Sequence, residues 1–167
     1  HHTTEDISVL RCLPNLTLLS PATPNQVSKC VELAYDHEGP VYIKIGMNHE
    51  KEYFDTGSDI SNTGMDVLKK GSDVAIFSTG SILEEAMKAG GLLESSGIST
   101  SIINVVSLKP FDARAAMKEA EKVKVVFTLE EHNIIGGMGS ILAEAFSYNG
   151  FMKRIVPIGL IDRKSVV

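Results

Sequence analysis

The chain has 167 residues, of which 43% are hydrophobic and 22% charged, and its formal net charge is −5. This composition is that of a globular protein and excludes a disordered chain. The acidic balance, with lysines scattered along the chain, argues against nucleic acid as a partner. No apolar run approaches the ~18 residues that span a bilayer, so we expect no membrane partner either.

The sequence contains two cysteines, Cys12 and Cys30, and each falls within a helical pattern. Two such residues are too few for a disulfide framework or a zinc site. The start of the chain also lacks the basic-then-apolar pattern of a signal peptide. We therefore predict core thiols and a cytoplasmic location.

Residues 1–45 predict the order helix, strand, helix, strand, ending in the run Val41–Ile45. The second helix has the clearest start, because Thr23 can act as N-cap, Pro24 suits the first turn and Gln26 can complete a capping box. Two strands cannot form a sheet with a core of its own. We expect this part to be disordered or to borrow contacts from a neighbour.

Residues 46–63 are polar and aperiodic, and we interpret them as an interdomain linker. From residue 64 onwards, short apolar runs alternate with helices of about a dozen residues. This alternation predicts a three-layer α/β/α domain over residues 64–167, with a mostly parallel five-stranded sheet. The strands are predicted at Val67–Leu68, Val74–Phe77, Ile102–Val106, Val123–Phe127 and Arg154–Ile158.

The helix after the strand at Val74 carries local predictions of its own. Ser81 and Glu84 have the spacing of a capping box at its start. Gly97 is expected to end it in the left-handed conformation. The pair Gly90-Gly91 would cost ~1–2 kcal/mol against alanines in a solvent-exposed helix, so we expect it to pack closely on a neighbour.

Glu130, Glu131 and His132 follow the strand at Val123–Phe127 and predict a polar loop, which leads into the glycine turn Gly136–Ser140 and a helix. The carboxyl edge of such a sheet is where ligands bind in doubly wound folds. Adjacent acids and a histidine on one loop are nevertheless no metal-ligand set without partners elsewhere.

The glycine turn permits a phosphate site, because backbone N–H groups at a helix start can hold an anion. However, Gly136–Ser140 has neither the dinucleotide spacing nor the P-loop lysine, and the two preceding carboxylates would repel phosphate. The favoured interpretation is a tight turn that packs the helix against the sheet or against a subunit neighbour.

Together these motifs resemble the transketolase family, in collinear order over nearly the whole chain. The first group resembles the end of the pyrimidine-binding domain: His1-His2-x-x-Glu5-Asp6, Leu13-Pro14-Asn15-Leu16, Ser20-Pro21-Ala22 and Gly39-Pro40-Val41-Tyr42-Ile43. The second resembles the family's C-terminal domain: Ser78-Thr79-Gly80-Ser81, Asn104-Val105-x-x-Leu108-Lys109-Pro110-x-Asp112, Glu130-Glu131-His132, Gly136-Gly137-Met138-Gly139-Ser140 and Ile161-Asp162-Arg163. The closest likeness is to the C-terminal section of transketolases encoded as two shorter polypeptides. Deoxyxylulose-phosphate synthases and β-subunits of 2-oxo-acid dehydrogenases are the nearest alternatives.

The resemblance implies ketol transfer between sugar phosphates on thiamine diphosphate with Mg²⁺, at a site made between two subunits. The family holds the diphosphate and metal with a Gly-Asp-Gly…Asn segment of another domain, which these 167 residues lack. Its cofactor-activating glutamate precedes the position of His1. We therefore expect no cofactor or metal ligand in this chain and no activity from it alone. The implied partners are the remaining transketolase domains, in cis or as an N-terminal subunit, and a second copy in a homodimer.

The resemblance places one catalytic histidine at His1, with His2 beside it as in some synthases. In the family this imidazole faces the thiazolium and the substrate oxygens, where it donates hydrogen bonds or moves protons near neutral pH. A remnant of a purification tag is the alternative origin of the two histidines. The family spacing to Glu5 and Asp6 favours the catalytic interpretation.

Met47 departs from the family pattern. Two residues after the strand Val41–Ile45, the family usually carries an arginine that grips the substrate phosphate, and methionine cannot make that contact. Either Lys44 or His49 binds the phosphate instead, or the substrate is not a usual sugar phosphate.

Two classes of function stay open: part of a transferase, or a free-standing interaction or regulatory module on the same fold. Upstream sequence separates them. A Gly-x-Thr directly before His1 and a cofactor-activating glutamate farther upstream would place the chain in the enzyme, whereas a natural start methionine near His1 would favour the module.

Overall fold

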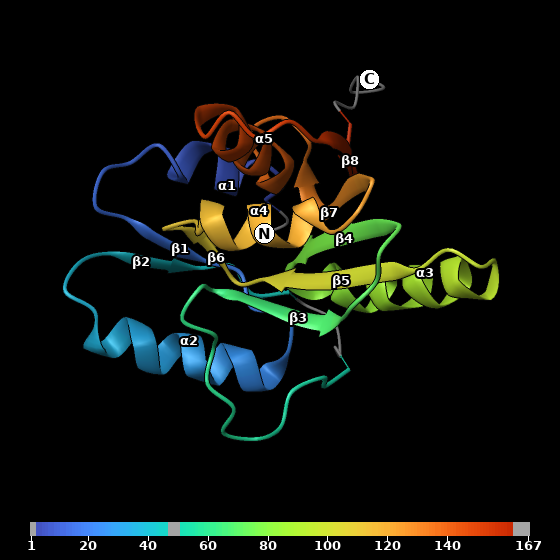
Figure 1. Cartoon of the computed structure of the whole chain (residues 1–167). Coiled ribbons are helices and arrows are strands. Elements are labelled where there is room, and N and C mark those ends of the chain that lie inside the picture. The colour runs from blue at the N-terminus through green and yellow to red at the C-terminus, as the bar shows by residue number, and fades with distance from the viewer. Residues whose placement is uncertain (1–2, 47–50, 162–167) are drawn as a thin grey trace, which may run out of the picture.

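Figure 1 shows a computed structural model of the chain, which describes residues 3–46 and 51–161. The helices are α1 (Asp6–Leu10), α2 (Pro24–Asp36), α3 (Leu83–Ser95), α4 (Ala113–Glu121) and α5 (Met138–Tyr148), with a 3₁₀ turn η1 at Gly80–Ile82. The strands are β1 (Thr17–Leu19), β2 (Val41–Ile43), β3 (Met65–Lys69), β4 (Val74–Thr79), β5 (Thr100–Val105), β6 (Ser107–Lys109), β7 (Val125–Asn133) and β8 (Arg154–Leu160). In the two described ranges, no helix has the length and apolar character needed to cross a membrane.

The larger sheet has five strands in the order β3-β5-β4-β7-β8. Strand β4 runs parallel to both of its neighbours, with Val74 opposite Thr100 on β5 and opposite Val125 on β7. Strand β8 continues the parallel arrangement, whereas the edge strand β3 is antiparallel to β5. The prediction of a mostly parallel five-stranded sheet is confirmed.

Helices cover both faces of this sheet (Figure 1). Alternate residues of β4 point to opposite faces, as strand geometry requires. Phe77 packs in one core cluster with Ile7 of α1 and Leu142 of α5, and α4 contributes to the same cluster. Ile76 belongs to a second cluster with Leu83 of α3. The three-layer α/β/α architecture is therefore confirmed.

A smaller three-stranded sheet has the order β2-β1-β6. Strand β1 is parallel to β2 and antiparallel to β6, with Leu18 opposite Lys109. The strand Ser107–Lys109 was not predicted, and it supplies the third strand that the first part of the chain lacks. The expected disorder of residues 1–45 is therefore wrong for residues 3–45, which borrow a strand from the same chain.

The start of α2 links the two parts of the chain. Thr23 caps the helix as predicted, accepting from the Gln26 N–H at 3.5 Å. The Gln26 side chain does not return to Thr23; its Oε1 accepts from the Ala22 N–H and from Asn104 Nδ2, each at 3.0 Å. Gln26 Nε2 also donates to Asp66 Oδ2 at 3.0 Å. This buried network ties α2 to β3 and β5, and burial raises the pKa of Asp66.

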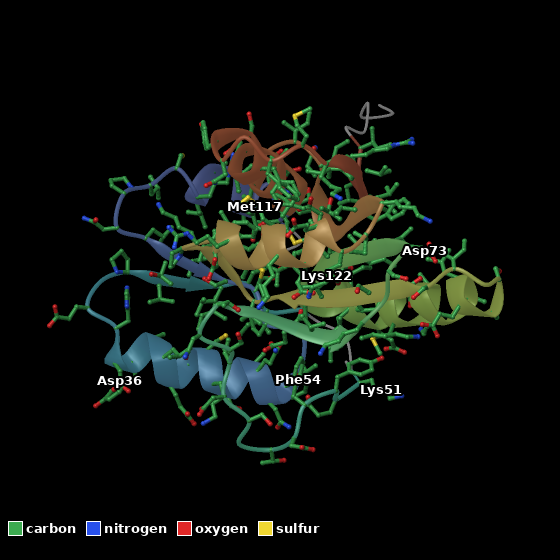
Figure 2. The ribbon with its side chains drawn as sticks, viewed as in Figure 1. Asp36, Lys51, Phe54, Asp73, Met117 and Lys122 are labelled. Atoms are coloured by element: carbon green, nitrogen blue, oxygen red, sulfur yellow. The ribbon has the colours of Figure 1, made fainter. Side chains whose placement is uncertain are left out.

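The described part of the predicted linker lies against α2. Asn25 donates from its backbone N–H to Glu52 Oε2 at 3.0 Å and from Nδ2 to the Phe54 carbonyl at 2.9 Å. Figure 2 shows Phe54 beside the N-terminal end of α2, with Asp36 at the opposite end of that helix. Phe54 also packs against the core cluster beneath α3.

The start of α3 differs from the prediction. The turn η1 precedes the helix, which begins at Leu83 without a side-chain cap, so the proposed Ser81–Glu84 capping box is wrong. The Ser81 hydroxyl instead donates to Glu131 Oε2 at 2.6 Å, across the carboxyl edge of the sheet.

The glycines of α3 behave partly as predicted. Gly97 ends the helix with φ +79°, in the left-handed region. A Cβ on Gly90 would lie 2.9 Å from Ile102 Cδ1, so this residue does pack closely on β5. Gly91 has no atom within 4 Å of such a Cβ, and close packing does not explain it.

Candidate functional site

Strand β7 continues through the residues that were predicted to form a polar loop, so that prediction is wrong. Side chains alternate along it: Glu130 and His132 are buried, at 3% and 0% exposure, whereas Glu131 is exposed. Polar side chains can occupy buried strand positions when each finds a hydrogen-bond partner. Glu130 and His132 therefore lie under α5 and α1, while Glu131 faces the opposite side of the strand.

Glu130 binds the start of α5. Its Oε2 accepts from the Met138 N–H at 2.6 Å and its Oε1 from the Gly139 N–H at 2.9 Å. Burial raises the pKa of Glu130, although these two donors favour the ionised form. A Cβ on Gly137 would collide with the Glu130 carboxylate, which explains a glycine there. The two amides that phosphate would use are occupied, which favours the tight-turn interpretation.

His132 connects β7 to α1. Its Nδ1–H donates to the Asn133 carbonyl at 2.6 Å, and its Nε2 accepts from the Ser8 N–H at 3.4 Å, the pattern of a neutral ring protonated on Nδ1. Two carboxylates flank the ring, with Asp6 Oδ1 3.8 Å from Nε2 and Glu130 Oε2 3.9 Å from Nδ1. Among residues 3–46 and 51–161, no cluster of three or more His, Cys, Asp or Glu side chains is placed to hold a metal ion.

Asp6 is the second buried carboxylate of this region. Its Oδ1 accepts from Lys44 Nζ at 2.6 Å and its Oδ2 from the Tyr42 hydroxyl at 2.7 Å, and its side chain is only 6% exposed. Burial by itself raises the pKa of Asp6, but the hydrogen bonds from Lys44 and Tyr42 and the Lys44 charge bring it below its ordinary value. Asp6 is thus an ionised carboxylate paired with Lys44 inside the protein.

These groups surround a cavity of about 590 Å³ between the two parts of the chain. Its walls include Thr3, Lys44, Thr79, Ser81 and Glu131. The cavity lies at the carboxyl ends of β4 and β7, the edge at which open α/β sheets bind ligands. Polar and apolar side chains share its lining, with hydroxyl groups and the acidic Glu131 beside the Lys44–Asp6 pair.

The structure describes Lys44 but not the other residues that the sequence analysis singled out for catalysis or phosphate binding. Lys44 lies in the cavity wall, whereas His1, His2, Met47 and His49 lie outside the described residues. Thr3, which follows His2, and Gly46, which precedes Met47, both line the cavity.

Sequence reasoning missed the roles of Asp6 and Tyr42. Asp6 lies 36 residues from Tyr42 and 38 from Lys44, and no local pattern connects positions so far apart. One signal was available: Tyr42 and Lys44 are two positions apart along an extended segment and so point to the same side.

Two family models match the chain. "Transketolase, C-terminal domain" matches residues 64–166, and "Transketolase, pyrimidine binding domain" matches residues 1–48. Since the first match alone covers more than half of the chain, the protein belongs to the transketolase family, as the motifs indicated.

Individual relatives agree with this assignment. The chain is 33% identical to one subunit of the apulose-4-phosphate transketolase of Actinobacillus succinogenes, covering 90% of this chain and 48% of that protein. It is 31% identical to a putative transketolase C-terminal section of Methanocaldococcus jannaschii, covering 97% and 51% respectively. A solved structure described as "split gene transketolase, inactive beta4 tetramer" superposes with a TM-score of 0.91 at 35% identity, covering 96% of this chain and 53% of that one. The chain thus spans about half the length of each of these three proteins.

Proposed function

We propose that this chain supplies the C-terminal part of a thiamine-diphosphate-dependent transketolase, which transfers a ketol unit between sugar phosphates in carbohydrate metabolism. One observation carries the proposal: at least 90% of the chain matches about half of proteins described as a transketolase subunit or a transketolase C-terminal section. A 1-deoxy-D-xylulose-5-phosphate synthase of Carboxydothermus hydrogenoformans is also 33% identical, but the match spans only 26% of that protein.

The division of the chain follows from this proposal. Residues 1–45 form the tail of a pyrimidine-binding domain, residues 46–63 the linker and residues 64–167 the C-terminal domain. The remaining transketolase domains are supplied in cis or by an N-terminal subunit, and the complete enzyme forms a homodimer. Cys12 and Cys30 are both free thiols, which suits a reducing cytoplasm. Cys30 is buried as predicted, whereas Cys12 is exposed, so the prediction of a core thiol is wrong for Cys12.

His1 and His2 are the proposed catalytic residues, and Lys44 and His49 the proposed substrate-binding residues. Lys44 is favourably placed, since it lines the cavity. An ammonium group has three donors, and Asp6 and the Thr3 carbonyl engage two of them. Among the described residues no acceptor engages the third, which we propose binds an anionic or hydroxyl group of a substrate in the cavity.

The family implies thiamine diphosphate in the complete enzyme, and we propose that Mg²⁺ accompanies it. The described residues do not fit the diphosphate and its metal. The α5 amides hold the chain's own Glu130, and the cavity wall carries Glu131, which repels a diphosphate. We therefore assign the cofactor cradle to the missing domains.

Reconstitution tests this division of labour. The chain is assayed for ketol transfer alone and after mixing with its N-terminal partner polypeptide, thiamine diphosphate and Mg²⁺. We expect no turnover and no tight cofactor binding from the chain alone, and turnover in the mixture. Sub-micromolar cofactor binding by the isolated chain, measured by titration calorimetry, would contradict the assignment of the cradle. An inactive mixture that still binds cofactor would contradict the proposed activity.

A further inference from the structure

A second cavity, of about 530 Å³, lies where the C-terminal end of α2 meets the end of the predicted linker and the loop between β6 and α4. Small-molecule sites have volumes of about 300–1,000 Å³ and occur preferentially where two parts of a protein meet. The described residues that line this second cavity include none that lines the first, which contains Lys44. The second cavity is therefore separate from the proposed substrate site.

Hydrogen bonds fix the wall of the second cavity. His37 Nε2 lies 3.1 Å from Thr17 Oγ1 and ties the end of α2 to β1. The Ser107 hydroxyl donates to the Pro110 carbonyl at 2.6 Å. The Ser107 N–H donates to the Gly64 carbonyl at 3.1 Å and joins the end of the linker to β6. The cavity is therefore formed by the chain itself, as small-molecule sites usually are.

Both parts of the chain contribute apolar side chains to this wall. Ala34 comes from α2 and Val41 from β2, whereas Ile60 belongs to the linker and Phe111 to the loop before α4. Transfer of an apolar group from water to such surroundings is favourable. The second cavity therefore suits a ligand with an aromatic or aliphatic body.

The charges around the second cavity favour a cation. Within the described chain its wall contains no lysine or arginine, whereas Lys44 lines the first cavity. Asp112 lines it and caps α4 through Oδ1, which accepts from the Ala115 N–H at 2.9 Å. The second oxygen of a carboxylate can accept from another donor.

The end of α2 adds to this negative potential. Its last carbonyl groups carry a partial negative charge, as they do in every α-helix. The last turn contains no basic residue to balance that charge, and Asp36 lies at the same end of the helix (Figure 2). His37, which ends the helix, is part of the cavity wall.

We propose that the second cavity binds a small cationic amphipathic molecule, an amine with an aromatic or aliphatic body. The ammonium group pairs with Asp112 and with the end of α2, and the body packs against Ala34, Ile60 and Phe111. A sugar phosphate does not suit this cavity, because its anionic group would be repelled by Asp112 and its hydroxyl groups would face apolar side chains. The inference is thus independent of the proposed ketol transfer.

Three indole compounds that differ in the charge of the head group test the proposal: tryptamine, a cation, tryptophol, which is neutral, and indole-3-acetate, an anion. Each is titrated into the full chain at about pH 8, where histidine is neutral, and is followed by amide chemical shifts in NMR spectra. Tryptamine should bind with a Kd of about 1 mM, as is usual for a ligand of its size, and shift the amides of Ala34, Ile60 and Phe111. Indole-3-acetate should bind about tenfold more weakly, because its charge is repelled.

Two variants locate the site. Ala34→Leu places a larger side chain in the wall without harm to the helix and should weaken tryptamine binding about tenfold. The matched control is Ala143→Leu, at an exposed position of α5 outside the wall, which should bind tryptamine as the wild type does. Asp112→Asn keeps a residue suited to cap α4 but removes the charge. It should weaken tryptamine about threefold and leave tryptophol unchanged.

Saturable binding of tryptamine that Ala34→Leu weakens and Ala143→Leu preserves would support the proposal. No saturable binding below about 10 mM, or equal binding by the wild type and Ala34→Leu, would overturn it. Equal affinities for tryptamine and indole-3-acetate would overturn the preference for a cation. If Ala34→Leu does not fold, Asp112→Asn decides, and an unchanged affinity of that variant for tryptamine would overturn the proposal.

Discussion

The two parts of the chain bury their apolar side chains to different degrees. In the larger sheet all six residues of β5 are buried. In the smaller sheet all three residues of β2 are half-buried, and α2 leaves Val31, Leu33 and Tyr35 exposed, at 53%, 51% and 90%. The part from residue 64 onwards therefore has a fully buried central strand, although its edge strand β8 has no buried residue. Before residue 46, strand β1 is covered by other parts of the described chain, whereas the side of α2 that carries Val31, Leu33 and Tyr35 is exposed.

The lengths of the matched relatives suggest a reason for the exposed apolar side chains of α2 and the half-buried strand β2. The chain covers 48% of the Actinobacillus succinogenes subunit and 53% of the split-gene transketolase structure, so those proteins are longer than these 167 residues. We expect the bare side of α2 and the free edge of β2 to be covered by the missing portion of the pyrimidine-binding domain. We therefore expect β5 to have all its packing partners within this chain, whereas α2 and β2 gain some of theirs from the missing portion.

Aromatic residues in the two parts offer the strongest test of this contrast. Phe77 is fully buried, so Phe77→Ala should lower the free energy of unfolding by about 3–5 kcal/mol, because it removes a large side chain and leaves a cavity. Tyr35→Ala, on the exposed side of α2, should change it by less than about 0.5 kcal/mol in the isolated chain. Urea denaturation of both variants measures the difference. Similar losses for the two would mean that α2 is covered, for example by a second copy.

Two glycine substitutions, at Gly136 and at Gly150, test the contact between α1 and the turn before α5. Gly136 has φ +77°, and a Cβ there would lie 2.5 Å from Ser8 Cβ on α1. Gly136→Ala should therefore destabilise the chain by about 2–4 kcal/mol, combining left-handed strain with overlap.

The matched control for this contact is Gly150→Ala. Gly150 has φ +65°, and a Cβ there would meet no atom within 4 Å, so only the strain of about 1–2 kcal/mol applies. The difference between the two variants in urea denaturation reports how tightly α1 packs on the turn that precedes α5. Equal losses of unfolding free energy in the two variants would show that α1 moves away from residue 136 at little energetic cost.

Acid titration tests the smallest effect, the pairing of Asp6 with Lys44. Because the pKa of Asp6 in the folded protein lies below its ordinary value of 3.8, its stabilising contribution is complete above that value and is lost as the pH falls through the folded pKa. Asp6→Asn should lower the free energy of unfolding by about 1.5 kcal/mol at pH 7.

The stability difference between wild type and Asp6→Asn should shrink steadily below about pH 4, measured by urea denaturation at several pH values. Glu130 contributes with the opposite sign, since its raised pKa means that ionisation above its ordinary value of 4.5 reduces stability. Because Glu130 is present in both proteins, it cancels in the comparison. A difference that does not depend on pH would show that Asp6 is not paired in solution.

The sequence predicted those elements whose causes are local. Thr23 and Pro24 lie next to each other and define the start of α2, so that helix was correctly placed. Strand β6 was missed because three residues carry no pattern of their own and the partner strand is far away in sequence. The end of β7 was predicted as a loop because Glu130 is charged, and its partners, the amides of α5, become visible only in the folded chain.

The candidate site shows the same limit. Motif resemblance identified Lys44, the only one of the four predicted site residues that the structure describes. The resemblance could not show that Lys44 is already paired with Asp6, because that contact depends on how α1 packs beside β2 and β7. Extending the strand periodicity two positions beyond Tyr42 would have placed Tyr42 and Lys44 on one face of the strand. It would not have identified Asp6 as the partner that they share.

The antiparallel pairing of β1 with β6 has a consequence for synthesis on the ribosome. Leu18 pairs with Lys109, so β1 leaves the exit tunnel about 90 residues before its partner. At roughly 5–20 residues per second, β1 waits about 5–18 s with the edge that will pair with β6 unpaired. During that interval the unpaired edge of the nascent segment can pair with another chain. Slow translation across residues 46–106 should therefore increase aggregation of this protein more than slow translation after residue 109.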